Sequence, residues 1–266
     1  TVAQGLVTGS LGVASGQAGL DVLQAGLGNA VAVLSSNDLG VIGTNLAGLS
    51  GVYSDMGSFA QGLINSELGI SGAGALSGLQ LAIGHAQSAQ SAVTIAGLQL
   101  AVSDLQGSYG SLAGTPLAGV VNGVMGIGSG SQLADIQVSL GQALTAQGST
   151  TIGGMQAAIE LLQGSYGNAG SLAQGIINGG LGVGAQPGIV GINAIAGALS
   201  QAGNVVGAGT LTGMQSALGL LSGTVYGNAG SIAQGVIDSG LGLAQPGQAG
   251  IGAMQAALAD AIGAQG

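Results

Sequence analysis

The sequence predicts an all-α protein made of stacked repeats of about 57 residues, each with three short helices rich in glycine and alanine. Three observations lead to this prediction. A short apolar segment returns along the chain, the tyrosines return with the same period, and helix-capping residues stand at matching places. A fixed period of this size is typical of proteins in which each unit buries its apolar face against its neighbours. We therefore expect residues 1–266 to form one continuous array of about four and two-thirds repeats, without separate domains.

The returning segment defines the first helix of the repeat. Its clearest copies are Ala60–Asn65, Ala173–Asn178 and Ala233–Asp238, and weaker copies are Leu117–Asn122 and Ala3–Thr8. Serine followed three residues later by glutamine, as in Ser171 and Gln174, predicts a capping box at the helix start. In the divergent copy, Thr115 before Pro116 predicts an N-cap followed by proline at the first helical position. Glycine in a left-handed C-cap is expected to end the copies, at Gly12, Gly69, Gly126, Gly182 and Gly242.

Two positions of this first helix recur and are the candidate structural positions. One is glycine, which costs about 0.5–1 kcal/mol in a helix relative to alanine. Its recurrence predicts that neighbouring helices approach closely there, at Gly62, Gly119, Gly175 and Gly235. The other position is polar, at Asn65, Asn122, Asn178 and Asp238. Two interpretations stay open for it: a ladder of side-chain hydrogen bonds that caps backbone groups of the adjacent repeat, or ordinary residues near a helix end.

The second and third helices follow from apolar periodicity. Ile192, Ile195, Ala198 and Leu199 share one helical face, and equivalent segments are expected at residues 17–34, 74–91, 131–147 and 248–264. The third helix begins after threonine, as at Thr94, Thr151 and Thr210, or after Asp38, and it ends near Gly107 and Gly164. Met155, Ala158, Ile159 and Leu162 give its buried face. About fourteen short helices result.

Two other repeat folds compete with the helical one. A polyproline II bundle needs glycine at every third position, and the glycines of this chain drift out of that spacing. A β-solenoid could use a sub-period of about 19 residues, and it is the alternative fold. The chain favours helices because alanine, leucine, glutamine and methionine are good helix formers, whereas alternating β-branched and aromatic residues are few.

The composition excludes several classes of partner. The chain has no Lys and no Arg, one His and nine acidic residues, which give a net charge of −9. Nucleic-acid binding is not expected, because no cations are present to neutralise phosphates. Attraction to anionic lipids is excluded for the same reason. We also expect no membrane span, since polar residues and glycine interrupt each apolar run before the roughly 20 residues that a bilayer requires.

The chain offers little chemistry for catalysis. His85 is the only imidazole and no cysteine is present, so we expect no metal site and interpret His85 as an incidental surface or groove residue. The acidic residues are dispersed and form no calcium-loop pattern. Glycine-rich segments such as Gly126-Ile127-Gly128 lack the lysine and the preceding strand of a phosphate loop. We therefore predict no catalytic residue, no cofactor and no enzymatic activity.

A repetitive, nearly uncharged chain rich in Gly, Ala, Ser and Gln resembles the silk-like structural proteins of the spidroin and fibroin type. The resemblance lies in composition and repetition, and it implies a secreted, extracellular material. The chain begins at Thr1 rather than Met, so we expect a mature form or part of a longer protein.

Both ends fall inside a repeat, and stacking of these incomplete ends predicts head-to-tail self-assembly into a fibre or matrix. The protein's expected partner is therefore itself, as a homo-oligomer or filament. The alternative function is a repeat module that binds a surface such as ice or a polysaccharide, supported by the regularly spaced Thr151 and Thr210.

Overall fold

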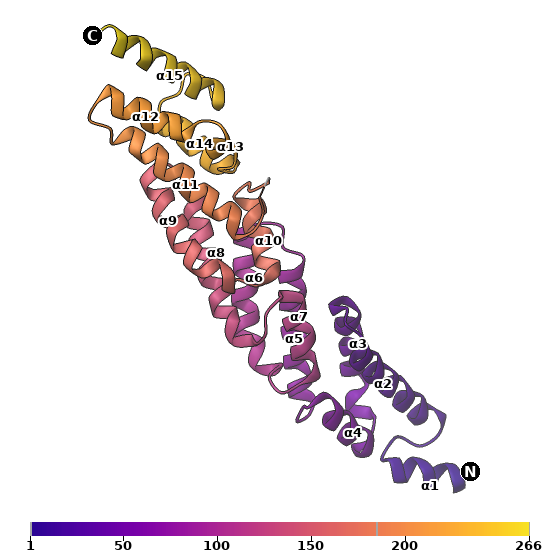
Figure 1. The fold of residues 1–266 in the computed structure, drawn as a ribbon. Coiled ribbons are helices and arrows are strands. Elements are labelled where there is room, and N and C mark those ends of the chain that lie inside the picture. The colour runs from indigo at the N-terminus through magenta and orange to yellow at the C-terminus, as the bar shows by residue number, and fades with distance from the viewer. Residues whose placement is uncertain (1, 185, 266) are drawn as a thin grey trace. The chain divides into compact units, whose positions relative to one another are not determined.

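The described part of the chain is entirely helical. A computed structural model describes residues 2–184 and 186–265, and every regular element within these residues is a helix (Figure 1). No strand occurs in them. The all-α prediction is therefore confirmed, and the alternative of a β-solenoid has no support.

The helices are short and separated by tight turns. Fifteen α-helices lie in the described residues, one more than the approximate number expected, because the turn that contains the fourth tyrosine, Tyr226, forms the single-turn helix α13. They are α1 (Val2–Leu11), α2 (Gln17–Ser35), α3 (Leu39–Val52), α4 (Ser58–Leu68), α5 (Ala73–Gln90), α6 (Ile95–Ser108), α7 (Pro116–Met125), α8 (Leu133–Gly148), α9 (Ile152–Ser165), α10 (Gly170–Gly180), α11 (Ile189–Val206), α12 (Leu211–Leu221), α13 (Thr224–Gly227), α14 (Ser231–Gly240) and α15 (Gln248–Gly263). Short 3₁₀ turns occupy residues 53–55, 109–111, 130–132 and 166–168.

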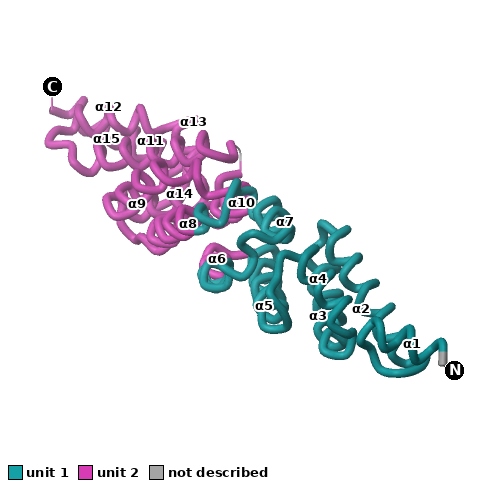
Figure 2. Tube along the Cα trace, turned by 90° about the horizontal axis from the view of Figure 1, so that it is seen from below, with its two compact units in different colours: residues 1–92, 100–133 teal, residues 93–99, 134–266 magenta. Residues whose placement is uncertain are grey.

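The chain divides into two compact units, coloured separately in Figure 2. Unit 1 comprises residues 1–92 and 100–133, and unit 2 comprises residues 93–99 and 134–266. The division falls inside α6 rather than between two repeats. The single array over residues 1–266 stays a prediction.

Unit 1 is organised by contacts between helices that are near in sequence. Helix α3 packs against α2 and α5, and the short helices α4 and α7 pack on α2 and α5 respectively. The core is aliphatic: Ile42, Leu46, Leu79 and Ile83 are fully buried. Small and medium-sized side chains fill this core, as the low aromatic content of the sequence requires.

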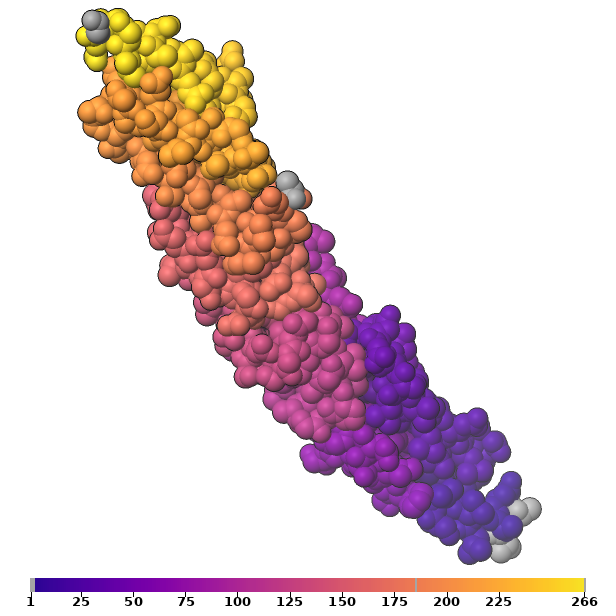
Figure 3. All heavy atoms as spheres, viewed as in Figure 1, coloured from indigo at the N-terminus to yellow at the C-terminus, as the bar shows by residue number. Residues whose placement is uncertain are grey.

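Unit 2 follows the same pattern. Helix α11 packs against α9 and α12, α12 packs against α15, and α14 contacts both α9 and α11. Its surface changes colour in sequence order from magenta through orange to yellow (Figure 3). The predicted buried face of α11 is confirmed, because Ile192, Ile195, Ala198 and Leu199 have no exposed area. The predicted face of α9 is confirmed as well, with Met155, Ala158, Ile159 and Leu162 buried.

Side chains cap the third helix of the repeat where the sequence predicts it. Thr151 Oγ1 accepts a hydrogen bond from Gly154 N, and Thr210 Oγ1 accepts one from Gly213 N. The Asp38 carboxylate caps α3 by accepting from Gly40 N and Val41 N. Each bond satisfies a backbone N–H that has no partner inside its helix. The left-handed glycines are also confirmed, with φ between 63° and 70° at Gly12, Gly69, Gly126, Gly182 and Gly242.

The predicted capping boxes are wrong. Helix α14 begins at Ser231, but the N-cap is Gly230 and no side chain caps it. Helix α10 begins at Gly170, so Ser171 lies inside its first turn. Thr115 is the N-cap of α7 with Pro116 following, as predicted, yet its hydroxyl donates to Leu112 O instead of capping the helix. The glutamines of the expected boxes make a different contact, described below.

Among the residues that the structure describes, two helices, α2 and α11, are long and apolar enough to cross a membrane by length and composition, with mean hydropathies of 1.2 and 1.4. The buried face of α11 belongs to the core of unit 2. Core helices of soluble proteins meet the same criterion, so these two helices are weak support for a membrane protein. The absence of a membrane span therefore stays a prediction.

Candidate functional site

The recurring polar residues of the first helix bind the tyrosines. Each tyrosine hydroxyl donates to a side-chain oxygen 12 or 13 residues later. The O···O distances are 2.5 Å for Tyr53–Asn65, 2.7 Å for Tyr109–Asn122, 2.9 Å for Tyr166–Asn178 and 2.7 Å for Tyr226–Asp238. The rings are buried in three of the pairs, with Tyr53, Tyr166 and Tyr226 at most 5% exposed. A buried phenol needs a hydrogen-bond partner, and the Asn or Asp supplies one.

A glutamine completes this arrangement in three of the four copies. Gln174 Nε2 donates to Tyr166 O at 3.0 Å, and Gln234 Nε2 donates to Tyr226 O at the same distance. Gln61 makes the equivalent bond to Tyr53 O at 2.8 Å. The copy at Tyr109 has Ala118 at the corresponding place and lacks this bond. We call the set of Tyr, Gln and Asn or Asp the tyrosine clamp. It fastens the turn that contains the tyrosine to the helix that follows this turn.

The two clamps of unit 2 differ in charge. Burial raises the pKa of Tyr166, against a smaller lowering by the hydrogen bond to Asn178. Burial also raises the pKa of Tyr226, and the hydrogen bond to Asp238 and the negative charge of that carboxylate raise it further. Asp238 has a second acceptor, Oδ2, which accepts from Gly247 N at 3.0 Å. The carboxylate thereby joins Tyr226 to the residue that precedes α15.

Neither interpretation of the recurring polar position describes the clamp. The bonds of Asn65, Asn122 and Asn178 run to tyrosine hydroxyls rather than forming a ladder that caps backbone groups. Only Asp238 combines the tyrosine bond with a backbone cap. The signal was present in the sequence, because tyrosine and the polar residue return at nearly constant separation.

The recurring glycines do not mark close helix approach, and this prediction is wrong. A Cβ added at Gly62, Gly119, Gly175 or Gly235 would meet nothing within 4 Å. All four positions are exposed in the described chain. Close approach occurs elsewhere, at the ends of α10 and α14. A Cβ on Gly180 would lie 2.5 Å from Ile95 Cδ1, and one on Gly240 would lie 2.7 Å from Ile152 Cδ1.

Replacing Gly175 with alanine is expected to stabilise unit 2 by about 0.5–1 kcal/mol, because it restores helix propensity at an open position. Gly182→Ala is the matched comparison. Gly182 has φ +70°, where a side chain is strained, so this variant is expected to destabilise by about 1–2 kcal/mol. Urea unfolding of both variants measures the difference. A midpoint for Gly175→Ala equal to or below that of the parent would contradict this expectation.

His85 joins two helices of unit 1. Its Nδ1 lies 2.9 Å from Ser108 Oγ, and that hydroxyl also contacts the carbonyl oxygens of Asp104 and Leu105. The Ser108 hydroxyl has one hydrogen to donate, so which partner donates in the His85–Ser108 pair depends on the imidazole tautomer. The half-buried imidazole fastens α5 to the end of α6.

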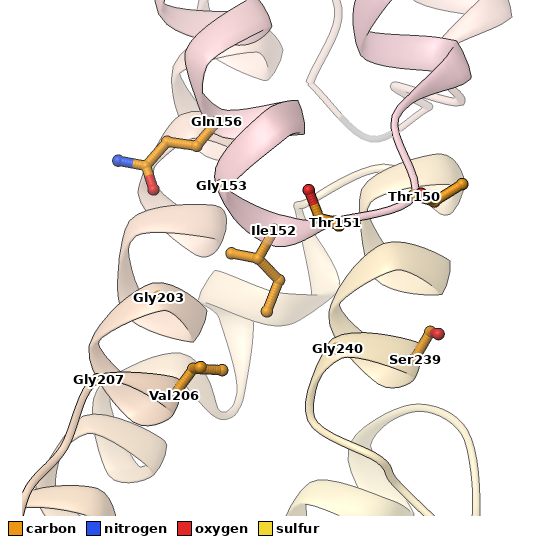
Figure 4. A pocket seen from close by; sticks show the side chains of 10 residues that line it. All are labelled: Thr150, Thr151, Ile152, Gly153, Gln156, Gly203, Val206, Gly207, Ser239 and Gly240. Carbon is orange, nitrogen blue, oxygen red and sulfur yellow. The ribbon is translucent and has the colours of Figure 1, made fainter.

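A hollow in unit 2 lies beside Ile152, and we call it the Ile152 hollow. It has a volume of about 510 Å³. The start of α9 and the last turns of α11 and α14 surround it, and Ile152 points between the latter two helices (Figure 4). Its lining residues are Thr150, Thr151, Ile152, Gly153, Gln156, Gly203, Val206, Gly207, Ser239 and Gly240. None of these residues carries a charge.

Metal-ligating groups are dispersed. Within the described residues no three His, Cys, Asp or Glu side chains lie close enough together to hold a metal ion. No known protein-family model matches the chain, and no curated protein or solved structure is significantly similar to it. The geometry of the clamps and of the Ile152 hollow is therefore the basis of the functional proposals that follow.

Proposed function

We propose that the protein is a non-enzymatic structural protein that self-assembles head to tail into an extracellular fibre or matrix. The finer architecture belongs to this proposal: repeats of about 57 residues, each with three helices, in one array. The tyrosine clamp supports the repeat, because the bond from tyrosine to Asn or Asp returns four times along the described chain and the glutamine bond accompanies it in three of these copies. The recurring Asn and Asp residues of the clamps are thus assigned a role in stabilising the fold.

The exposed apolar side chains carry the proposal. Large aliphatic residues lie open to solvent in both units, among them Leu6 at 73%, Val93 at 89% and Leu220 at 62% exposed. Charged residues, which usually keep such surfaces apart, make up only 3% of the chain. Apolar surface with few charges favours association, and association between copies buries it.

Assembly is expected to strengthen as the pH falls toward about 4, where carboxyl groups take up protons. The net charge of −9 has no cationic counterpart, so copies brought together repel each other at neutral pH. If association raises the proton affinity of the carboxylates, acid favours the assembled state by linkage. Light scattering from pH 3 to 8, with electron microscopy of the scattering samples, measures this dependence.

Added salt provides the control. At neutral pH it screens the repulsion between the carboxylates of neighbouring copies, so it should strengthen assembly in part, as acid does. Filaments that form under acid or salt would support the proposal. A chain that stays monomeric at all pH values and at high concentration would contradict it.

A further inference from the structure

The close contact between isoleucine and glycine occurs twice in unit 2, with one difference. In the first copy Ile95 packs on Gly180, and in the second Ile152 packs on Gly240. Beside the first contact, Gln147 Nε2 donates to Gly180 O at 3.1 Å. The residue at the matching place in the second copy is Val206, since Gln147 and Val206 each precede the capping threonine of the next helix by four positions.

This difference explains the Ile152 hollow. The side chain of Gln147 spans the space between α8 and the last residue of α10 and contacts its carbonyl oxygen. The isopropyl group of Val206 is shorter, has no hydrogen-bond donor and is 61% exposed. The space that the glutamine crosses in one copy is therefore open in the other, next to Gly240.

The lining of the hollow defines the chemistry of a ligand. Gly240 O takes the place of the carbonyl that receives an amide hydrogen in the first copy. Thr150 and Ser239, which carry hydroxyl groups, line the hollow, and Ile152 and Val206 are its larger apolar lining residues. Gln156 Nε2 donates to Glu160, so the charge beside the hollow is negative and disfavours anions. A volume of about 510 Å³ lies within the range of small-ligand sites, about 300–1,000 Å³.

We propose that the Ile152 hollow binds an uncharged saccharide of one or two sugar units. A sugar offers hydroxyl or acetamido donors for Gly240 O, acceptors for the hydroxyls of Thr150 and Ser239, and an apolar ring face for Ile152 and Val206. The proposal is independent of self-assembly, because it concerns a site contained within one unit.

The experiment is a titration of the ¹⁵N-labelled full chain with chitobiose, which is uncharged and carries both hydroxyl and amide donors. Amide shifts are expected to concentrate at Gly153, Gly207, Ser239 and Gly240. Glucose 6-phosphate is the charged comparison and should leave these signals in place. Absence of shifts up to about 50 mM chitobiose, a concentration that detects even weak binding, would overturn the proposal. Shifts spread evenly along the chain would overturn it as well.

Two variants locate the site. Val206→Gln recreates the residue of the first copy, so its amide should reach Gly240 O, close the hollow and weaken binding at least tenfold. Leu161→Gln is the matched control on α9, because Leu161 is 60% exposed and does not line the hollow, and its binding should be unchanged. Thr150→Val removes the hydroxyl of one lining residue at an exposed position and should also weaken binding. Equal affinity of Val206→Gln and the parent would overturn the proposal.

Discussion

Replacing Tyr166 with alanine is expected to destabilise unit 2 by about 3–5 kcal/mol, the range for removing a large buried aromatic side chain. The ring is 2% exposed, and its loss would leave a cavity beside α10 as well as an unused acceptor on Asn178. Urea unfolding followed by circular dichroism measures the change.

Tyr166→Phe separates packing from hydrogen bonding at the same position. It keeps the ring and removes only the bond to Asn178, whose half-buried side chain can turn to water, so about 1 kcal/mol is expected. If the phenylalanine variant lost as much stability as the alanine variant, the hydrogen bond rather than the ring would hold the clamp together.

Alkali is expected to unfold unit 2 through its clamps. The pKa of Tyr226 is raised in the folded state above its ordinary value of 10, chiefly by burial and then by Asp238. A raised pKa means that the folded state holds the phenol proton more tightly than the unfolded state does. The associated stability is therefore fully present below pH 10 and is lost as the pH rises above it. Tyr166 contributes in the same direction.

Two spectroscopic signals, tyrosinate absorbance and circular dichroism, test this expectation. Tyrosinate absorbance and helical circular dichroism of the parent should change together above pH 10, because Tyr226 ionises as its clamp opens. Tyr226→Phe removes the titrating group, so its stability should depend less on pH in this range, even though its stability at pH 7 is lower. Asp238→Asn removes the charge beside the phenol and should also reduce the pH dependence. A parent whose helix content is unchanged after complete tyrosine ionisation would contradict the assignment.

The sequence predicted the helices because their signals are local. Thr151, Thr210 and the left-handed glycines act on backbone groups within a few residues, so position in the chain determines their role. Gln174 shows where local reading fails. It stands at the right distance from Ser171 for a capping box, but it donates to Tyr166 O, outside its helix. Whether Gln174 accepts from a backbone N–H at the helix start or donates to Tyr166 O depends on the path of the preceding turn, which the sequence pattern does not contain.

The glycines show a second limit of the sequence. Recurrence at Gly175 resembled a packing requirement, whereas crowded positions include Gly180 and Gly240, which do not have a glycine counterpart in every copy. Which helix faces are covered depends on partners that are distant in sequence, such as Ile95 for Gly180. The Ile152 hollow was unpredictable for the same reason, since it arises where Val206 replaces a residue that bridges two separate helices.

The short span of the tyrosine clamp has a consequence for the folding pathway. Each clamp joins residues only 12 or 13 positions apart. Loops of about this length close in roughly 10–100 ns, far faster than domains fold. Several segments can therefore begin folding independently, as in other repeat proteins, and growth can proceed from whichever segment forms first. A substitution in one clamp should thus redirect the order of folding toward the remaining clamps while changing the overall rate little.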